Sequence, residues 1–123
     1  MSQIDKLDSV AIIIGFYNDK KYIYAQVKSI FEQTHKNIKI FIFDDNSPFK
    51  LTKSFLKLTQ ENKKKVSIIR RKKNLGSAKN FLFALKEINE DFDYYGFSDQ
   101  DDIWEKDKIK ISINALNKKC KDK

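Results

Sequence analysis

Residues 10–16 form a continuous apolar run, Val-Ala-Ile-Ile-Ile-Gly-Phe, in which β-branched side chains predominate. A strand with one solvated face alternates apolar and polar residues, so this run predicts a strand that is buried on both faces. Strands of this kind occur mainly in parallel sheets that helices cover on both sides. The rest of the chain must therefore supply further strands and two layers of helices.

Three more apolar runs of strand length follow along the chain, at 38–43, 66–69 and 94–98. Segments with apolar residues at helical spacing separate the runs, and another follows the last run. We expect these helices at about 20–33, 48–62, 77–88 and from 102 onward. The alternation predicts an α/β fold, a Rossmann-like open and mainly parallel sheet with helices on both faces.

The length of 123 residues suits one domain, which we expect to span residues 1–123 with a frayed basic tail at 118–123. No apolar run approaches the ~20 residues that a membrane span needs. The first residues also lack the basic and then apolar pattern of a signal peptide, so we expect a cytoplasmic protein. The one cysteine, Cys120, excludes a disulfide framework and a Cys/His zinc set.

Basic residues give the chain a net charge of +8, and seven of them lie in two clusters, 63–65 and 70–73. Such a patch either is solvated or attracts nucleic acid, an anionic membrane surface or a phosphorylated ligand. No aromatic side chain lies between the cations, which argues against binding of single-stranded nucleic acid. We therefore do not expect nucleic acid as a partner, whereas the inner face of a membrane would suit the patch.

Ligands of open parallel sheets bind at the carboxyl ends of the strands, near the point where the strand order reverses. The residues that follow the four predicted strands are Tyr17-Asn18-Asp19, Asp44-Asp45, Arg70-Arg71 and Asp99-Gln100-Asp101. The chain has only three glycines, so neither a Gly-x-Gly-x-x-Gly motif nor a Walker loop is possible. An aromatic ring, acids and bases at one edge of the sheet instead favour a phosphorylated ligand held through a metal ion.

Three carboxylates, Asp99, Asp101 and Asp102, follow the run 94–98. At ~4 Å two carboxylates repel by about 1 kcal/mol in water and by about 4 kcal/mol at an effective dielectric of 20, so a divalent cation would stabilise the cluster. Mg²⁺ and Mn²⁺ prefer oxygen ligands, and Mg²⁺ shares its coordination with substrate phosphates. Asp102, with Glu105 three residues later, fits the N-cap of the last helix. That assignment leaves Asp99 and Asp101 as the functional pair.

Two other acidic pairs lead to different expectations. Asp91 and Asp93 form a second Asp-x-Asp before the last strand, where we expect a solvated turn. Asp44 and Asp45 would also suit a signalling receiver domain. A receiver needs a phospho-accepting Asp after its third strand, where this chain has Arg70. Phosphorylation by a small phosphodonor would be needed to revive that alternative.

Five spaced motifs cover nearly the whole chain: Val10-Ala-Ile-Ile-Ile-Gly-Phe-Tyr-Asn18, Ser29-Ile-Phe-Glu-Gln-Thr34, Phe43-Asp-Asp-Asn-Ser47, Asn74-Leu-Gly76 with Asn80, and Ser98-Asp-Gln-Asp-Asp-Ile-Trp104 with Asp107-Lys108. In this order they resemble the nucleotide-sugar half of the family 2 inverting glycosyltransferases, which adopt a GT-A fold. The last motif is similar in wording to that of rhamnosyltransferases. The chain thus resembles the N-terminal portion of such an enzyme.

The resemblance implies a role for four residues. Asp45 would hydrogen-bond the pyrimidine base of the donor, and Tyr17 would flank that base. Asp99 would lie near the ribose. Asp101 would bind Mn²⁺ or Mg²⁺ on the diphosphate. The resemblance therefore implies a metal-dependent glycosyltransferase, with these side chains as its donor site.

The resemblance also implies the two substrates. The donor would be a UDP- or dTDP-linked sugar, and the acceptor a glycan or a lipid-linked glycan in cell-surface polysaccharide biosynthesis. Transfer would invert the configuration at the anomeric carbon. Lys79 or Arg71 would add a positive charge at the diphosphate, although a surface role stays open for each.

The chain departs from the family pattern in two respects. Gly15 stands where the family often has a small hydroxyl residue, which would remove one contact to the base. The general base of the family lies on a later segment, beyond Lys123, so no catalytic residue is identified here. The alternative to a complete enzyme is therefore a truncated, non-catalytic module that binds a nucleotide-sugar.

Overall fold

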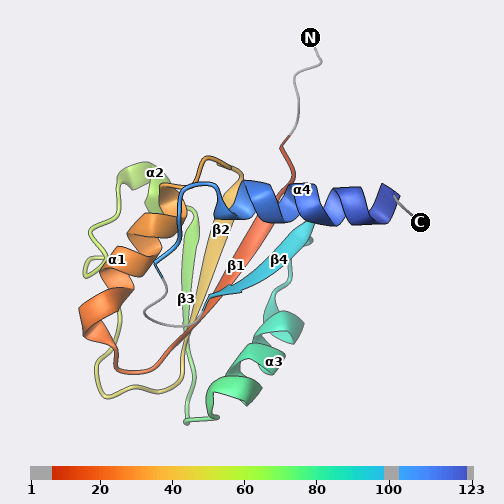
Figure 1. Ribbon diagram of the computed structural model, residues 1–123. Helices are drawn as coiled ribbons and strands as arrows, with labels where there is room; N and C mark the ends of the chain where they lie inside the picture. Colours follow the sequence, from red (N-terminus) through yellow and green to blue (C-terminus); the bar gives the residue numbers. More distant parts are fainter. Residues whose placement is uncertain (1–6, 99–102, 122–123) are drawn as a thin grey trace.

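The computed structural model describes residues 7–98 and 103–121 of the chain (Figure 1). Strands and helices alternate along the sequence, as expected from the apolar runs. The elements are β1 (Val10–Phe16), α1 (Lys20–Phe31), β2 (Ile38–Asp44), α2 (Gln60–Lys63), β3 (Val66–Arg70), α3 (Ser77–Glu87), β4 (Tyr94–Ser98) and α4 (Lys108–Lys121). The last helix thus extends into the range 118–123 that was expected to be a basic tail.

The four strands form one parallel sheet in the order β3-β2-β1-β4. From β1 the chain moves outward to β2 and β3 and then returns to place β4 on the other side of β1. The strand order therefore reverses between β1 and β4. In open sheets of this type the ligand crevice lies at that reversal, outside the carboxyl ends of the strands. The predicted Rossmann-like α/β fold is confirmed.

The side chains of β1 alternate between two apolar layers, and this explains why its run has no polar residue. Ile12 and Ile14 pack on one face with α1 and α4, whereas Ala11 and Ile13 pack on the other face with α3. All four are at most 1% exposed. Figure 1 shows α4 crossing in front of the strands, with α3 on the far side of the sheet.

The helix expected over 48–62 is wrong, because only residues 60–62, which begin the four-residue helix α2, are helical in this segment. Leu51 and Leu56 are buried in the core, five positions apart, and the chain between them runs through turns. Lys57 has a φ of +52°, a left-handed conformation that ends a helical path. The apolar residues of this segment therefore reach the core from a loop instead of from one helical face.

The expected start of the last helix at Asp102 is also wrong. The helix α4 begins at Lys108, and the described residues 103–107 before it are not helical. The backbone N–H of Lys108 donates to the carbonyl of Glu105 at 3.1 Å, so Glu105 contributes its backbone to the turn before the helix. Asp102 itself lies outside the described residues.

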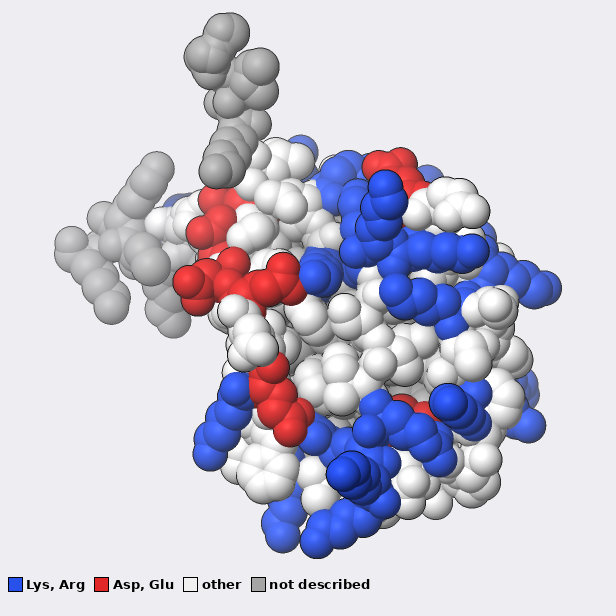
Figure 2. All heavy atoms as spheres, turned by 180° about the vertical axis from the view of Figure 1, so that it is seen from behind, with Lys and Arg blue, Asp and Glu red and all other residues white. Residues whose placement is uncertain are grey.

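Two of the seven cations in the basic clusters, Arg70 and Arg71, are paired with acidic side chains. Arg70 pairs with Asp44, and Arg71 pairs with Glu87, each at 2.9 Å. Figure 2 shows the side of the sheet away from α4, where Lys and Arg side chains lie above and below a largely uncharged middle and Asp and Glu side chains lie along its left border. Within the described ranges, no helix is both long and apolar enough to cross a membrane.

Candidate functional site

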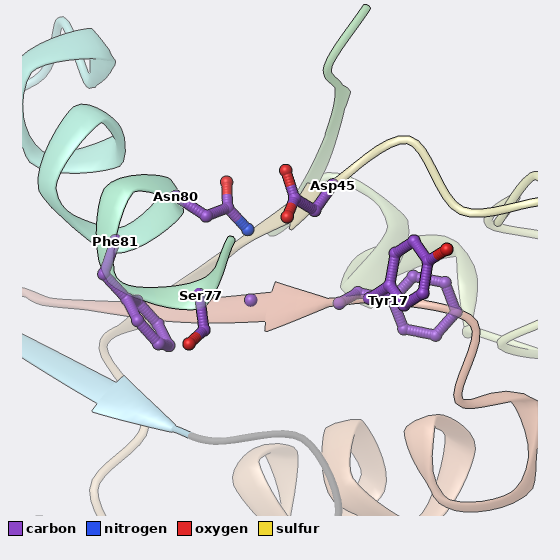
Figure 3. A pocket seen from close by; sticks show the side chains of 7 residues that line it. Tyr17, Asp45, Ser77, Asn80 and Phe81 are labelled. Atoms are coloured by element: carbon purple, nitrogen blue, oxygen red, sulfur yellow. The ribbon is translucent and has the colours of Figure 1, made fainter. Parts of the chain in front are cut away.

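A pocket of about 290 Å³ opens at the carboxyl end of the sheet, beside the point where the strand order reverses. Its walls come from the end of β1, from the residue after β2 and from the first turn of α3. Figure 3 shows that the Asp45 and Asn80 side chains converge above the end of β1, with Tyr17 at the outer side. The lining residues are Gly15, Phe16, Tyr17, Asp45, Ser77, Asn80 and Phe81.

Asp45 joins the end of β2 to the start of α3. Its two carboxylate oxygens accept hydrogen bonds from the backbone N–H groups of Leu75 and Gly76, at 2.7 and 2.9 Å. The side chain of Asn74 donates to the Asp45 carbonyl at 3.1 Å. A carboxylate has about four acceptor sites, so about two remain for a ligand. Asp45 lines the pocket, and it also fixes the turn that leads into α3.

Asn80 is the polar centre of the α3 wall and is 2% exposed. Its side-chain amide donates to the Phe43 carbonyl on β2 at 3.0 Å, and its side-chain oxygen accepts from Arg71. Arg71 also donates to the Asn80 carbonyl and is only 8% exposed. The guanidinium group of Arg71 thus braces α3 against the sheet, and it does not line the pocket.

Gly15 lets α3 approach the end of β1 closely. A Cβ atom at this position would lie 3.2 Å from the ring of Phe81 and 3.4 Å from the side-chain nitrogen of Asn80. The family's hydroxyl residue would therefore be crowded in this chain, because the Phe81 ring occupies the space beside Gly15. The Phe81 ring therefore packs where a side chain at position 15 would begin.

Tyr17 and Ser77 form the open rim of the pocket. Tyr17 follows β1 directly and is 46% exposed, so part of its side chain faces solvent at the mouth of the pocket. Ser77 is the first residue of α3 and is exposed. Lys79 is exposed on the same turn but is not part of the lining. The structure thus brings Tyr17 and Asp45 together and leaves Lys79 outside.

Asp44, the first acid of the pair after β2, has a structural role. It is fully buried and accepts hydrogen bonds from the backbone and hydroxyl of Ser47, at 3.0 and 2.6 Å. Arg70, its partner in the β2–β3 register, completes the set of donors. The two adjacent acids therefore have different roles. Asp44 stabilises the loop after β2, and Asp45 lines the pocket.

The acidic segment follows β4, which ends at Ser98. Asp99 and Asp101 lie outside the described residues, so their predicted roles stay predictions. Among the residues that the structure does describe, no group of three or more His, Cys, Asp or Glu side chains could hold a metal ion. Asp91 and Asp93 are exposed at the opposite, amino end of β4, as expected for a surface turn, and Asp93 accepts from Ser9.

The sequence analysis did not predict a row of three buried polar residues, Gln26, Ser29 and Gln33, on α1 and just after it. This row binds the chain on both sides of the acidic segment, residues 99–102. Gln26 donates to the hydroxyl of Ser98 at 2.7 Å, before the segment. The Ser29 hydroxyl accepts from the backbone of Trp104 at 3.1 Å, after it. Gln33 follows with two more contacts, to the Glu105 carbonyl and to the Ile109 N–H. The signal was present, because positions 26, 29 and 33 have the 3 and 4 spacing of one helical face.

Comparison with known proteins agrees with this architecture. The sequence model of the family described as glycosyl transferase family 2 matches residues 11–122. The dTDP-rhamnosyl transferase RfbG of Shigella flexneri is 42% identical over 106 residues, which cover 81% of this chain and 35% of that protein. The chain therefore spans about a third of the length of this relative.

Solved structures share the fold. The Staphylococcus aureus TarS fragment 1–349 in complex with UDP-GlcNAc has a TM-score of 0.75 at 23% identity, covering 89% of this chain and 31% of that one. The mannosyltransferase PcManGT from Pyrobaculum calidifontis, in complex with GDP-Man and Mn²⁺, has a TM-score of 0.65 at 19% identity, covering 80% and 29%. These likenesses show that the chain shares the GT-A fold of these proteins. With the family match over almost its whole length, this chain belongs to glycosyl transferase family 2.

Proposed function

We propose that this chain is the donor-binding part of a glycosyltransferase that uses a metal-bound nucleoside-diphosphate sugar. One observation carries the proposal: Tyr17 and Asp45 flank a pocket at the carboxyl ends of β1 and β2, beside the strand reversal. Ligand sites in proteins have volumes of about 300–1,000 Å³, so the pocket of about 290 Å³ suits one part of the donor. We assign it to the base.

In this proposal the base lies against the ring of Tyr17, and Asp45 accepts a hydrogen bond from it. The backbone N–H groups of Leu75 and Gly76 hold the Asp45 carboxylate in place, so the acceptor is oriented before the ligand arrives. Preorganisation of this kind lowers the entropic cost of binding. The pyrimidine specificity, UDP or dTDP, follows from the pairing of Asp45 with an N–H of the base.

The diphosphate would extend from the pocket toward the segment after β4, where Asp99 would contact the ribose and Asp101 would hold Mn²⁺ or Mg²⁺. The donor set fits such an ion, because Mg²⁺ commonly uses one or two carboxylates and completes its shell with substrate phosphates and water. Both Asp45 oxygens already accept backbone N–H groups, so Asp45 is not assigned to the metal. The solved structure of PcManGT, a protein of the same fold, is a complex with GDP-Man and Mn²⁺.

The reaction would join an acceptor hydroxyl to the anomeric carbon of the sugar. The hydroxyl oxygen attacks from the face opposite the diphosphate, the bond from the anomeric carbon to the diphosphate oxygen breaks, and the configuration inverts. A bound divalent ion would neutralise the charge that grows on the departing nucleoside diphosphate. A general base must take the proton of the hydroxyl, and we assign it to the part of the enzyme that this chain does not span. The acceptor, a glycan or lipid-linked glycan, would bind to that same part.

A second function is binding of the nucleotide-sugar without transfer. It is favoured because the chain matches only part of the length of its relative RfbG. The chain spans 35% of RfbG, and no residue of the chain is assigned as the base. The two functions share the donor site and differ in turnover. Release of free sugar or formation of a glycoside from the donor by this chain alone would support the enzyme, and binding alone would support the module.

The donor site is tested by calorimetric titration of the chain with UDP and dTDP, with MnCl₂ and again with EDTA. We expect binding that weakens about tenfold or more when the metal is removed. Replacing Asp101 with Ala should have the same effect and abolish the response to metal. Replacing Asp91 with Ala is the matched control, because this exposed acid lies at the amino end of β4 and should leave the affinity unchanged.

The base contact is tested in the same titration by Tyr17→Ala. Stacking of a base on an aromatic ring contributes about 1–3 kcal/mol, which corresponds to roughly 5- to 150-fold in affinity. Tyr24→Ala is the control, since Tyr24 is a similarly exposed aromatic residue on α1. Failure of both nucleotides to bind overturns the proposal. Binding that ignores both EDTA and Asp101→Ala overturns the metal site alone.

A further inference from the structure

Two segments of the chain that contain no acidic residue come together on the outer side of α1. One is the helix α1 itself, and the other is the stretch 48–59 after β2. Each has three lysines and no Asp or Glu, although the whole chain has 17 acidic residues. Figure 1 shows the chain after β2 running beside α1. The fold thus gathers six lysines that are about 30 positions apart in sequence.

Contacts between lysines and aromatic rings join the two segments. The ammonium group of Lys20 lies 4.9 Å from the ring centre of Phe49, and the ammonium group of Lys57 lies 5.9 Å from the ring centre of Tyr24. Each pair takes one residue from α1 and one from the stretch 48–59, and both distances are within the range of a cation–π interaction. Lysines and aromatic rings therefore alternate across one continuous surface.

Four of the six lysines are exposed and form no ion pair within residues 7–98 and 103–121; they are Lys20, Lys21, Lys50 and Lys57. The clusters 63–65 and 70–73, which are the most basic stretches of the sequence, differ in this respect. Arg70 and Arg71 of those clusters are already paired with acidic side chains. The surface at α1 therefore carries four positive charges that are open to an anionic partner.

The aromatic rings of this surface distinguish between two kinds of anionic partner. Tyr22 and Tyr24 are each 40% exposed, and the ammonium groups of Lys21 and Lys57 lie over their rings, 5.2 and 5.9 Å from the ring centres. Single-stranded nucleic acid stacks its bases on open ring faces, which lysine covers here. Tyrosine at a membrane lies at the level of the lipid headgroups, and lysine extends its charge into them. The arrangement therefore favours a lipid surface.

We propose that the α1 surface, defined as Lys20, Lys21, Tyr22, Tyr24, Lys50 and Lys57, docks on an anionic membrane. The lysines contact lipid phosphates, and the two tyrosine rings lie among the headgroups. Each lysine near an anionic leaflet strengthens binding by about fivefold, so four lysines together give a useful affinity. The attraction is electrostatic and decreases with salt. The inference does not depend on nucleotide binding.

The test is co-sedimentation of the chain with vesicles of phosphatidylcholine alone, or of phosphatidylcholine and phosphatidylglycerol in equal parts. We expect binding only to the anionic vesicles, at about 0.1 M NaCl, and its loss at about 1 M, where the screening length falls from about 10 Å to about 3 Å. Replacing Lys21 and Lys57 together with Glu should weaken this binding by about 25-fold or more, which is about fivefold for each charge.

Lys86→Glu together with Lys118→Glu is the matched control, because it changes the net charge by the same amount. Both lysines are exposed, on α3 and α4, and Lys86 also lies over an aromatic ring, that of Phe83, at 5.9 Å. The control should weaken binding to the anionic vesicles by less than about fivefold. The urea midpoint of each variant checks that it is folded.

Three outcomes overturn the proposal. The first is absence of binding to the anionic vesicles at about 0.1 M NaCl. The second is an equal loss of binding in the Lys21 and Lys57 variant and in the control, because net charge alone would then explain the attraction. The third is tighter binding to a labelled single-stranded RNA than to vesicles, lost in the same variant, because nucleic acid would then be the partner.

The part of the two rings is tested by Tyr22→Ala together with Tyr24→Ala. This variant should bind the anionic vesicles about fivefold or more weakly, because the rings lose their apolar contact among the headgroups. Unchanged binding of this variant overturns the position assigned to the rings.

Discussion

Truncation of Gln33 to Ala tests whether the residues after the acidic segment are held by the polar row at α1. Gln33 is fully buried at the end of this row. Its side-chain amide donates to the Glu105 carbonyl at 2.6 Å, and its oxygen accepts the Ile109 N–H at 3.0 Å. The Ile109 N–H belongs to the first turn of α4, where helices have no partner of their own for this group. The substitution removes both contacts at once.

The expected loss of stability follows from the two groups that are left without partners. An unsatisfied buried donor or acceptor costs about 1–3 kcal/mol. The Ile109 N–H is buried and should cost the larger share, whereas water can reach the partly buried Glu105 carbonyl. We therefore expect Gln33→Ala to lower the free energy of unfolding by about 2–4 kcal/mol. A domain of this size has about 6–18 kcal/mol in total, so the variant should still fold.

Urea unfolding followed by tryptophan fluorescence measures this loss directly. The chain has one tryptophan, Trp104, and its backbone N–H is bound by Ser29 in the same row. With a urea slope of about 2 kcal/mol per molar, the midpoint should fall by about 1–2 M. Hydrogen exchange of the Ile109 amide should accelerate as well. In the nucleotide titration, the variant should bind UDP or dTDP more weakly, since the acidic segment loses one anchor.

Gln60→Ala provides the matched control, because Gln60 is an exposed glutamine on α2. Surface substitutions usually stay within about 0.5 kcal/mol. If Gln33→Ala and Gln60→Ala differ by less than about 0.5 kcal/mol, the row at α1 does not hold the segment, and the reasoning from its hydrogen bonds is refuted.

Three further substitutions have expected outcomes in the same urea assay. Asp44→Ala should lower the free energy of unfolding by about 2–3 kcal/mol, because it leaves Arg70 without its buried partner; Arg70 is 35% exposed, and a loss under 1 kcal/mol would contradict the pairing. Gly15→Val should lower the free energy of unfolding by about 1–3 kcal/mol, because the added side chain is overpacked against Phe81. It should also narrow the pocket and so weaken nucleotide binding in the titration. Gly76→Ala should cost about 1–2 kcal/mol from backbone strain alone, since φ is +88° and no atom lies within 4 Å of the added carbon; an unchanged midpoint would show that the turn can relax.

The sequence predicted the strands correctly but misassigned one helix and the start of another, and the error over 48–62 has a physical cause. A buried strand needs only a run of apolar residues, which residues 10–16 provide on their own. Leu51 and Leu56 are equally buried, yet they reach the core from turns. Apolar spacing over 48–62 could not reveal this, because a loop that is pinned to a core and a short amphipathic helix place similar residues at similar intervals.

The site was predictable only in part. Tyr17 and Asp45 could be predicted from their positions directly after predicted strands, because residues that follow parallel strands share one edge of the sheet. Asn80 and Arg71 could be named, but not their hydrogen bond, because it depends on how α3 packs against β2. The division between Asp44 and its neighbour Asp45 also depends on packing. Adjacent acids look alike until the side of the strand that each occupies is known.

Apolar runs and their alternation with helical periodicity determined the parallel sheet, since burial on both faces leaves few other arrangements for this chain. The family motifs in their order determined what kind of protein it is. Only the tertiary structure decided that Asp44 is bound by Arg70, that Asp45 braces the start of α3, and that β4 lies beside β1 on the side away from β2. These features depend on contacts between residues that are distant in sequence, and a periodic pattern carries no information about such contacts.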